Sequence, residues 1–164
     1  RNQMKILVVS DTHRKDDNLK LVLSEECPLD MLIHLGDAEG SEHFIPDWVN
    51  PECRMEMVLG NNDFFSRLDR EREIDIAGHK AFITHGHYYG VSMGPEGLVD
   101  EAKSRGCDIA MYGHTHRPFL DVIDGVTVLN PGSLSYPRQE GRRPSYMIIH
   151  VDADGKMDYQ QKYL

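Results

Sequence analysis

Residues 5–13 read Lys-Ile-Leu-Val-Val-Ser-Asp-Thr-His, an apolar run that ends at a carboxylate and an imidazole. A short apolar run bounded by polar residues is typical of a buried β-strand, which we expect over Lys5–Ser10. The next segment, Asn18–Glu26, has apolar residues at helical spacing and stops before a proline. We therefore expect a helix there, with Asp17 or Asn18 as its N-terminal cap.

Two more apolar segments continue this alternation of strand and helix. Asp30–Leu35 ends at Gly36-Asp37, and Met55–Leu59 ends at Gly60-Asn61-Asn62-Asp63. The order strand–helix–strand is that of an α/β protein. In the open sheets of this class, ligands bind beyond the carboxyl ends of the strands. The polar strand ends of this chain therefore indicate where a functional site would form.

The second half of the chain is richer in paired strands. The expected elements there are a hairpin of Glu73–Ile76 with Lys80–Thr84, a helix over Pro95–Arg105, a short strand at Ile109–Tyr112, a hairpin of Phe119–Ile123 with Val126–Leu129, and a pair of Tyr146–Val151 with Lys156–Tyr163. Asp-Gly and similar glycine-containing turns favour such hairpins. Two sheets packed together and flanked by helices would accommodate both halves.

Length and charge exclude several classes of protein. The 164 residues contain no internal repeat, so we expect a single domain over residues 4–164, with Met4 as the native start and residues 1–3 as an added remnant. Lys and Arg total 18 against 27 Asp and Glu, a net charge of −9, which disfavours strong nucleic-acid binding and a polybasic membrane anchor. The apolar runs are too short for a membrane span. Three widely spaced cysteines favour reduced, structural thiols in a cytoplasmic protein.

Residues that can bind metal ions follow five of the expected strands. They are Asp11 and His13, Asp37, Asn61, His85, and His114 with His116. Residues two apart in an extended segment point to the same side, so each two-residue motif can present both side chains to one cleft. Any one motif alone is more often a turn or a surface loop. Seven carboxylate, amide and imidazole groups together exceed one tetrahedral site and suit two divalent metals that share a bridging ligand.

The order of these motifs resembles that of a known superfamily. Asp11-x-His13, Gly36-Asp37, Gly60-Asn61-x-Asp63, His85-Gly86-His87 and Gly113-His114-x-His116 are similar to the calcineurin-like metallophosphoesterases. With Asn130-Pro131-Gly132-Ser133 and the short length, the chain resembles the YfcE-like branch of small phosphodiesterases, from residue 5 to about 151. The resemblance implies a four-layer αββα sandwich with two mixed β-sheets, the metallo-dependent phosphatase-like fold.

The resemblance also implies a metal centre and an activity. Asp11, His13 and His116 would hold the first metal, Asn61, His85 and His114 the second, and Asp37 would bridge the two. The implied reaction is phosphoester hydrolysis, with diesters favoured over monoesters, by a metal-bridging hydroxide that attacks phosphorus. Manganese is the expected metal, with nickel, iron or zinc as alternatives. A small phosphoester is the expected partner, and a homodimer is left open.

Three residues near the ligands are candidates for supporting catalytic roles. Many members of the superfamily have His where this chain has Asn62, which cannot act as a general acid. Hydrolysis would then be limited to good leaving groups or would use another acid. His87 is the nearest candidate for that acid, and an equally good interpretation makes it structural. Asp63 is expected to orient Asn61 or a neighbouring ligand.

The candidate substrate contacts are Arg14, Ser133 and Arg138. Arg138 belongs to a basic loop that could clamp a phosphate or could simply be solvated. Ser133 could border the site or act as a turn residue that bonds to the backbone. The alternative function is a catalytically silent scaffold of the same fold, as in the retromer sorting complex. All seven ligand positions are filled, which favours an enzyme, and the motif order disfavours another metallohydrolase such as an amidase.

Overall fold

The computed structural model describes residues 3–164, so Arg1 and Asn2 of the expected N-terminal remnant lie outside the described residues. Its strands are β1 (Met4–Val9), β2 (Met31–His34), β3 (Arg54–Met57), β4 (Glu71–Ile76), β5 (His79–Thr84), β6 (Ile109–Met111), β7 (Pro118–Ile123), β8 (Val126–Pro131), β9 (Ser145–Val151) and β10 (Met157–Tyr163). Its α-helices are α1 (Asp17–Glu26) and α2 (Glu96–Ser104), and its 3₁₀ turns are η1 (Ser41–His43), η2 (Ile45–Trp48) and η3 (His87–Tyr89). Within residues 3–164, no helix has the length and apolar composition needed to cross a membrane.

The strands form two mixed five-stranded sheets, which confirms the expected α/β class. The first has the order β10-β9-β1-β2-β3, with β1, β2 and β3 parallel and β9 antiparallel to both of its neighbours. The second has the order β4-β5-β6-β8-β7, with β5, β6 and β8 parallel and an antiparallel strand at each edge. Parallel neighbours need a crossover connection, and α1 and α2 supply two of these crossovers.

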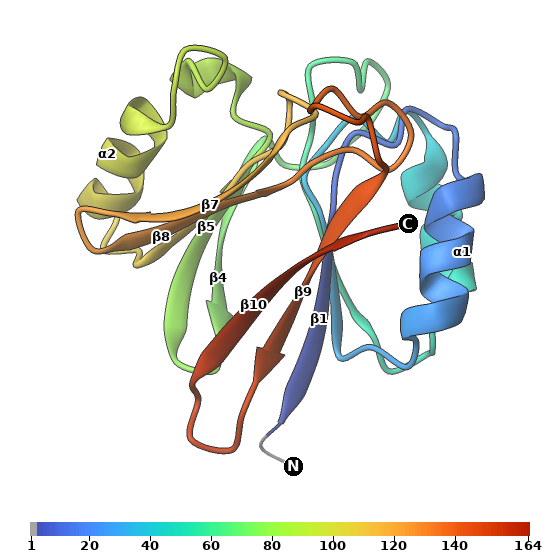
Figure 1. Cartoon of the computed structure of the whole chain (residues 1–164), viewed down its shortest axis with the longest axis horizontal. Coiled ribbons are helices and arrows are strands. Elements are labelled where there is room, and N and C mark those ends of the chain that lie inside the picture. Colours follow the sequence, from blue (N-terminus) through green and yellow to red (C-terminus); the bar gives the residue numbers. More distant parts are fainter. Residues whose placement is uncertain (1–2) are drawn as a thin grey trace.

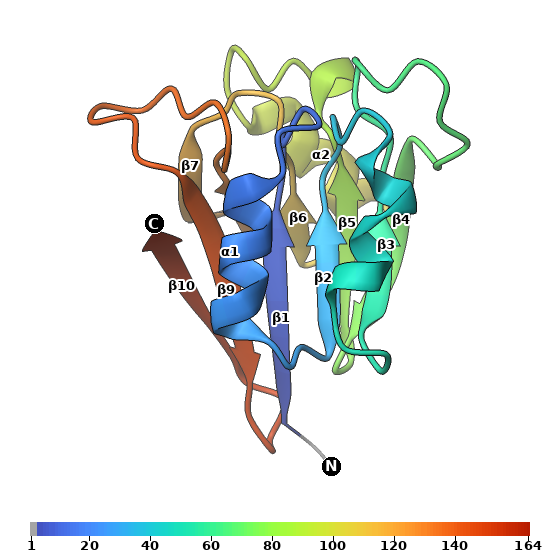
Figure 2. The same cartoon turned by 90° about the vertical axis from the view of Figure 1, so that its right-hand side faces the viewer.

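Figures 1 and 2 show four layers, with the two sheets between α1 and α2. Three clusters of buried apolar side chains hold these layers together. Residues of both sheets, such as Ile6, Ile33 and Ile83, share the cluster between the sheets. Leu19 and Val22 of α1 pack on the outer face of the first sheet. The outer face of the second sheet, which includes Phe82, packs against Leu98 and Val99 of α2 in the same way. The strands that are buried on both faces are therefore the continuous apolar runs of the sequence, as expected for parallel strands.

The expected hairpin turn between β7 and β8 is present, whereas the expected N-terminal cap of α1 is not. Asp124 and Gly125 both have positive φ, 51° and 80°, as a two-residue hairpin turn between β7 and β8 requires. The expected cap of α1 was wrong. The helix begins at Asp17, and the residue before it, Asp16, makes no capping hydrogen bond. Asp16 instead accepts a hydrogen bond from the Ser41 hydroxyl and so ties the start of α1 to η1.

The parallel strands direct their carboxyl ends to one end of the molecule. In Figure 2 the arrowheads of β1, β2 and β5 point the same way, and their following loops gather above them. The loop after β1 pairs with the loop after β2 through Asp11 N–H to the Gly36 carbonyl (3.0 Å). The loop after β6 joins the loop after β5 through Gly113 N–H to the His85 carbonyl (3.0 Å), and it joins the loop after β1 through His114 N–H to Asp11 Oδ2 (3.0 Å). Both sheets thus contribute loops to a single site.

Candidate metal centre

The loops that carry the candidate ligands have unusual backbone geometry. Asp11, His13, Asp37, His114 and His116 all have positive φ, between 49° and 72°. Residues with a Cβ rarely adopt this region, and such strain is concentrated at functional sites, where the surrounding structure enforces it. Here the enforcement includes the hydrogen bond from His13 N–H to the Asp37 carbonyl (2.8 Å). The strain turns these side chains toward one another.

Asp11, His13 and His116 form one compact group. Asp11 Oδ1 lies 3.3 Å from His116 Nε2 and 3.7 Å from His13 Nε2. Their ligand atoms all lie within 4.8 Å of one another, which is close enough to hold one ion. These are the three residues expected to hold the first metal.

Asp11, Asp37 and His85 form a second group that shares Asp11 with the first. His85 Nε2 lies 3.4 Å from Asp37 Oδ2 and 3.6 Å from Asp11 Oδ1, and all three side chains are buried. Asp37 Oδ2 is also 3.7 Å from His13 Nε2. The two groups are therefore adjacent, with carboxylates between them.

Hydrogen bonds fix which nitrogen of each histidine is free. The Nδ1 atoms of three histidines face oxygen acceptors: His13 faces Glu39 (2.7 Å), His85 faces the Leu35 carbonyl (2.6 Å) and His116 faces the Tyr136 carbonyl (2.7 Å). Nδ1 must therefore carry the proton, which leaves the Nε2 lone pair of each neutral ring directed at the carboxylates. Histidines that bind metals typically have this arrangement.

The electrostatics of the cluster favour added positive charge. Asp11 Oδ1 and His85 Nε2 are buried and have no hydrogen-bond partner within residues 3–164. Burial would raise the pKa of Asp11, but His116 and His13 outweigh it and hold that pKa well below its usual range. Burial likewise lowers the pKa of His13, but Asp11 and Glu39 reverse the effect and raise it to about 9. A divalent cation would likewise compensate the buried carboxylates and pair with the unpartnered atoms, so the donor set fits metal binding.

Asn61 and His114 lie beside these groups. The Asn61 side-chain oxygen is 3.2 Å from His114 Nδ1, and the backbone N–H of His114 donates to Asp11 Oδ2 (3.0 Å). Burial and the neighbouring His85 lower the pKa of His114 and so favour its neutral form. The structure therefore brings all seven candidate ligands to one place.

Asp63 and Asn62 both act on Asp37, in different ways. The buried carboxylate of Asp63 accepts backbone N–H groups from Asp37 (2.8 Å), Glu39 (2.7 Å) and Gly60 (2.7 Å). It thereby joins the loop after β2 to the loop after β3. Asn62 donates its backbone N–H to Asp37 Oδ1 (2.8 Å) and its side-chain amide to Oδ2 (3.0 Å). Asn62 thus holds both oxygens of the central carboxylate.

The remaining candidates lie at different depths around the cluster. His87 packs edge-on against His85 with ring centroids 5.4 Å apart, and burial lowers the pKa of His87. Ser133 is fully buried, donates to the Asp11 carbonyl (2.8 Å) and accepts the Tyr136 N–H, so it supports the ligand loops from beneath. His34, expected in the core, is buried there and hydrogen-bonded to Thr12 (3.0 Å).

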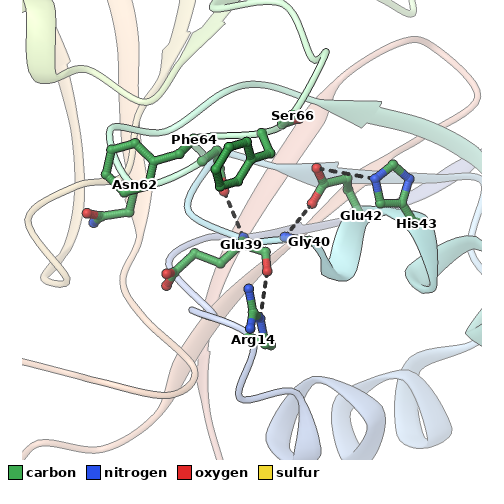
Figure 3. A pocket seen from close by; sticks show the side chains of 10 residues that line it. Arg14, Glu39, Gly40, Glu42, His43, Asn62, Phe64 and Ser66 are labelled. Atoms are coloured by element: carbon green, nitrogen blue, oxygen red, sulfur yellow. Dashed lines mark hydrogen bonds and ion pairs between the residues drawn. The ribbon is translucent and has the colours of Figure 1, made fainter.

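Two open pockets border the cluster. The smaller, about 210 Å³, is lined by loops of the first sheet and includes Arg14, Glu39, Asn62 and Phe64. In Figure 3 a dashed line joins the Arg14 guanidinium to the carbonyl oxygen of Glu39 (2.9 Å). The larger, about 620 Å³, lies on the side of the second sheet and includes His114 and Arg138. Arg14 and Arg138 therefore line different pockets.

Glu39 and Tyr136 were missed from the sequence. Glu39 orients His13, and Tyr136 holds His116 through its carbonyl and packs its ring edge-on against His13 at 5.5 Å. The position of Glu39, two residues after Asp37, was the available signal, since the same spacing separates the two residues of Asp11-x-His13. Tyr136 acts through its backbone and leaves no signal in the sequence.

Comparison with known proteins agrees with this geometry. The sequence matches the family model of the calcineurin-like phosphoesterase superfamily domain over residues 4–154. A probable metallophosphoesterase of Mycoplasma pneumoniae is 33% identical over 150 residues, which cover 90% of this chain and 89% of that protein. Phosphodiesterase YfcE of Escherichia coli K12 is 27% identical over 173 residues, covering 91% of this chain and 89% of YfcE. The resemblance expected from the motif order is thereby confirmed.

Comparison with solved structures shows the same fold in another protein. Vacuolar Protein Sorting 29 from Cryptosporidium parvum aligns with a TM-score of 0.79 at 17% sequence identity, covering 100% of this chain and 99% of that chain. At this identity the likeness concerns the fold alone. It agrees with the two mixed sheets described above.

Proposed function

Since the chain belongs to the calcineurin-like phosphoesterase superfamily, we propose that it is a dinuclear metal-dependent phosphodiesterase. The observation that carries the proposal is the convergence of three Nε2 lone pairs, from His13, His85 and His116, on the carboxylates of Asp11 and Asp37. Divalent cations can compensate the two buried carboxylates in place of the protons that the raised pKa values of His13 and His85 otherwise favour.

The proposed ligands divide into two sets. Asp11, His13 and His116 would hold one ion, Asn61, His85 and His114 would hold the other, and Asp37 would contact both. Bound divalent ions would supply charge that neutralises phosphoryl oxygens and a lowered pKa for a coordinated water. Oxygen and imidazole donors without thiolate suit manganese, with nickel, iron and zinc as alternatives.

The residues of the chain position the reacting groups. Glu39 and the Leu35 and Tyr136 carbonyls keep three histidines in one tautomer. Asn62 fixes both oxygens of Asp37 and so keeps that carboxylate in place. Hydrolysis would add the oxygen of water to phosphorus, break the bond to one ester oxygen and give that oxygen a proton. The products are a phosphomonoester and an alcohol.

The two pockets support the preference for diesters. A phosphodiester has an organic group on each side of phosphorus, whereas a monoester has one. Asn62 lines the smaller pocket and donates to Asp37, so this pocket lies beside Asp37. His114 lines the larger pocket and lies against Asn61, so the larger pocket lies beside Asn61. One arm could occupy each pocket while the phosphate lies over the cluster. The exposed ring of Phe64 would give the smaller pocket an aromatic contact for one arm.

The scaffold alternative draws on the structural likeness to Vacuolar Protein Sorting 29. A protein that only presents a surface would not need three histidines held in one tautomer around two buried carboxylates. We therefore favour the enzyme, and metal binding together with turnover separates the two functions.

The experiment measures metal content and manganese-dependent hydrolysis of bis(p-nitrophenyl) phosphate, for the wild type and for Asp37→Ala. We expect two metals per chain and turnover in the wild type, and loss of both turnover and part of the metal in the variant. Asp47→Ala, at an exposed aspartate, is the matched control and should behave as the wild type. Full activity in Asp37→Ala, or a wild type that binds no metal, would refute the proposal.

A further inference from the structure

The larger pocket is lined by both apolar and cationic side chains. It lies between the loop of residues 90–95 and the loop that joins β6 to β7. Val91, Met93 and Phe119 contribute apolar side chains to its lining, and Arg117 and Arg138 contribute cationic ones. His114, a proposed metal ligand, also lines this pocket, so whatever occupies it lies next to the metal centre.

The two guanidiniums are not used by the fold. Within residues 3–164, no carboxylate lies within ion-pairing distance of Arg117 or Arg138 and neither guanidinium has a hydrogen-bond partner. Arg105, by contrast, contacts Glu71 (2.5 Å) and Glu101 (2.8 Å). An acidic chain with 27 Asp and Glu residues leaves these two cations free at the same pocket.

The backbones that carry these arginines are anchored to the ligand loop. Arg138 N–H donates to the carbonyl of His116 (3.0 Å). Arg117 N–H donates to the Thr115 hydroxyl oxygen (3.2 Å), which itself accepts from the Asn130 side chain (3.0 Å). Since His114 and His116 lie on the same loop, the backbones of both arginines are held close to the metal centre. A group bound by them would be held at a defined distance from the scissile phosphate.

We propose that the larger pocket binds a second phosphate carried on one arm of the phosphodiester substrate, with the organic part of that arm against Met93 and Phe119. This inference rests on the proposed function and narrows its substrate class to phosphorylated phosphodiesters, as in nucleotides with an additional phosphate. Two guanidiniums match the charge of a phosphate dianion and can bind its oxygens in a bidentate manner. The pocket volume of about 620 Å³ accommodates such an arm.

The test uses three p-nitrophenyl diesters that differ only at the end of the second arm: propyl, 3-carboxypropyl and 3-phosphooxypropyl. For the wild type we expect kcat/KM to favour the phosphate arm over the propyl arm by about tenfold or more, the effect of one or two charge-assisted hydrogen bonds. The ratio should collapse toward unity in Arg117→Gln and in Arg138→Gln. Arg67→Gln removes one exposed charge outside this pocket and should keep the wild-type ratio.

Calorimetry separates this inference from the proposed function. The metal-loaded protein should bind propane-1,3-diyl bisphosphate more tightly than propyl phosphate, and Arg117→Gln should remove the difference, even if no diester is hydrolysed. Equal kcat/KM values for the three arms, equal binding of the two phosphates, or a preference that survives both arginine variants would overturn the inference. A carboxylate arm that performs as well as the phosphate arm would overturn the assignment of a dianion.

Discussion

His13 Nε2 lies 3.2 Å from His116 Nε2, and both atoms face the same oxygen of Asp11. Glu39 and the Tyr136 carbonyl hold the Nδ1 protons of the two rings, so in neutral rings the facing nitrogens both carry lone pairs. Two lone pairs at this distance beside a carboxylate repel one another unless a cation lies between them. Without metal, a proton fills this contact, because the carboxylates of Asp11 and Glu39 raise the pKa of His13 to about 9, and a divalent ion would take the place of that proton.

Metal should therefore stabilise the folded state measurably. A ligand that binds only the native state at 100 times its Kd adds about 2.7 kcal/mol to the free energy of unfolding. We expect manganese to raise the Tm of chelator-treated protein, as measured by differential scanning calorimetry. His116→Ala should lose most of this rise, whereas His43→Ala, at a histidine whose side chain is 74% exposed, should keep it. The same rise in both variants would contradict a metal site at His116.

Asp63→Asn should weaken both the fold and the metal centre. The Asp63 carboxylate accepts three backbone N–H groups, and an amide has only one oxygen to replace two. Leaving one buried N–H unpaired costs about 1–3 kcal/mol, which denaturant unfolding would detect. Because two of the donors belong to Asp37 and Glu39, metal affinity should also fall by about 10- to 100-fold. Asp69→Asn, an exposed change nearby, is the control, and equal losses in both would refute the role of Asp63.

The sequence was sufficient to predict that the candidate metal ligands lie close together, because these residues follow the ends of the strands. Apolar runs such as residues 6–9 define buried strands, and parallel strands end at the same edge, so Asp11 and Asp37 must meet. Glycine-containing turns such as Asp124-Gly125 likewise predicted the hairpins. These features depend on local pattern and on a general rule about parallel sheets.

The residues that the sequence did not reveal act between loops far apart in the chain. Glu39 meets His13 across 26 positions, and the Tyr136 carbonyl meets His116 across 20. Carboxylates and backbone carbonyls occur in many loops, so only the folded structure shows that these two contact metal-ligand candidates. Arg117 is a similar case, because its significance comes from the pocket that it shares with Arg138.

Glu26→Gln should reduce stability in a pH-dependent way. Glu26 accepts from Lys162 Nζ (2.7 Å) and Tyr146 Oη (2.8 Å), and its other oxygen pairs with Lys5 (3.0 Å). Burial raises the pKa of Glu26, but Lys162 and Lys5 outweigh it and lower the pKa from its usual 4.5 to about 2. A carboxylate with a lowered pKa stabilises the folded state above its unfolded pKa and loses this effect as pH falls through the folded value.

The difference in unfolding free energy between wild type and Glu26→Gln should therefore be largest above pH 4.5, up to about 3 kcal/mol, and should vanish as the pH falls toward 2. Urea unfolding of both proteins at several pH values measures it. Comparing the two proteins at each pH cancels the titration of other carboxylates. Asp158→Asn, at an exposed position on the outer strand β10, is the control variant. A difference that stays constant across this range would show that the ion pairs do not provide the stabilisation.

Asn62 should make the rate depend steeply on the leaving group. Its side-chain amide donates to Asp37 Oδ2 (3.0 Å), and an amide has no proton to transfer to a departing alkoxide. Diesters with acidic phenol leaving groups should be hydrolysed far faster than those with alkyl leaving groups. Asn62→His should narrow that gap by about tenfold or more, since a positioned acid contributes about 10²–10⁴-fold. The nitrophenyl rate should fall at the same time, because the variant loses the side-chain hydrogen bond to Asp37.

Asn62→Gln is the control for this prediction, because it keeps an amide and supplies no acid, and it should leave the gap between leaving groups unchanged. A shallow dependence in the wild type would mean that another residue donates the proton, and His87→Gln would then be the variant that steepens it.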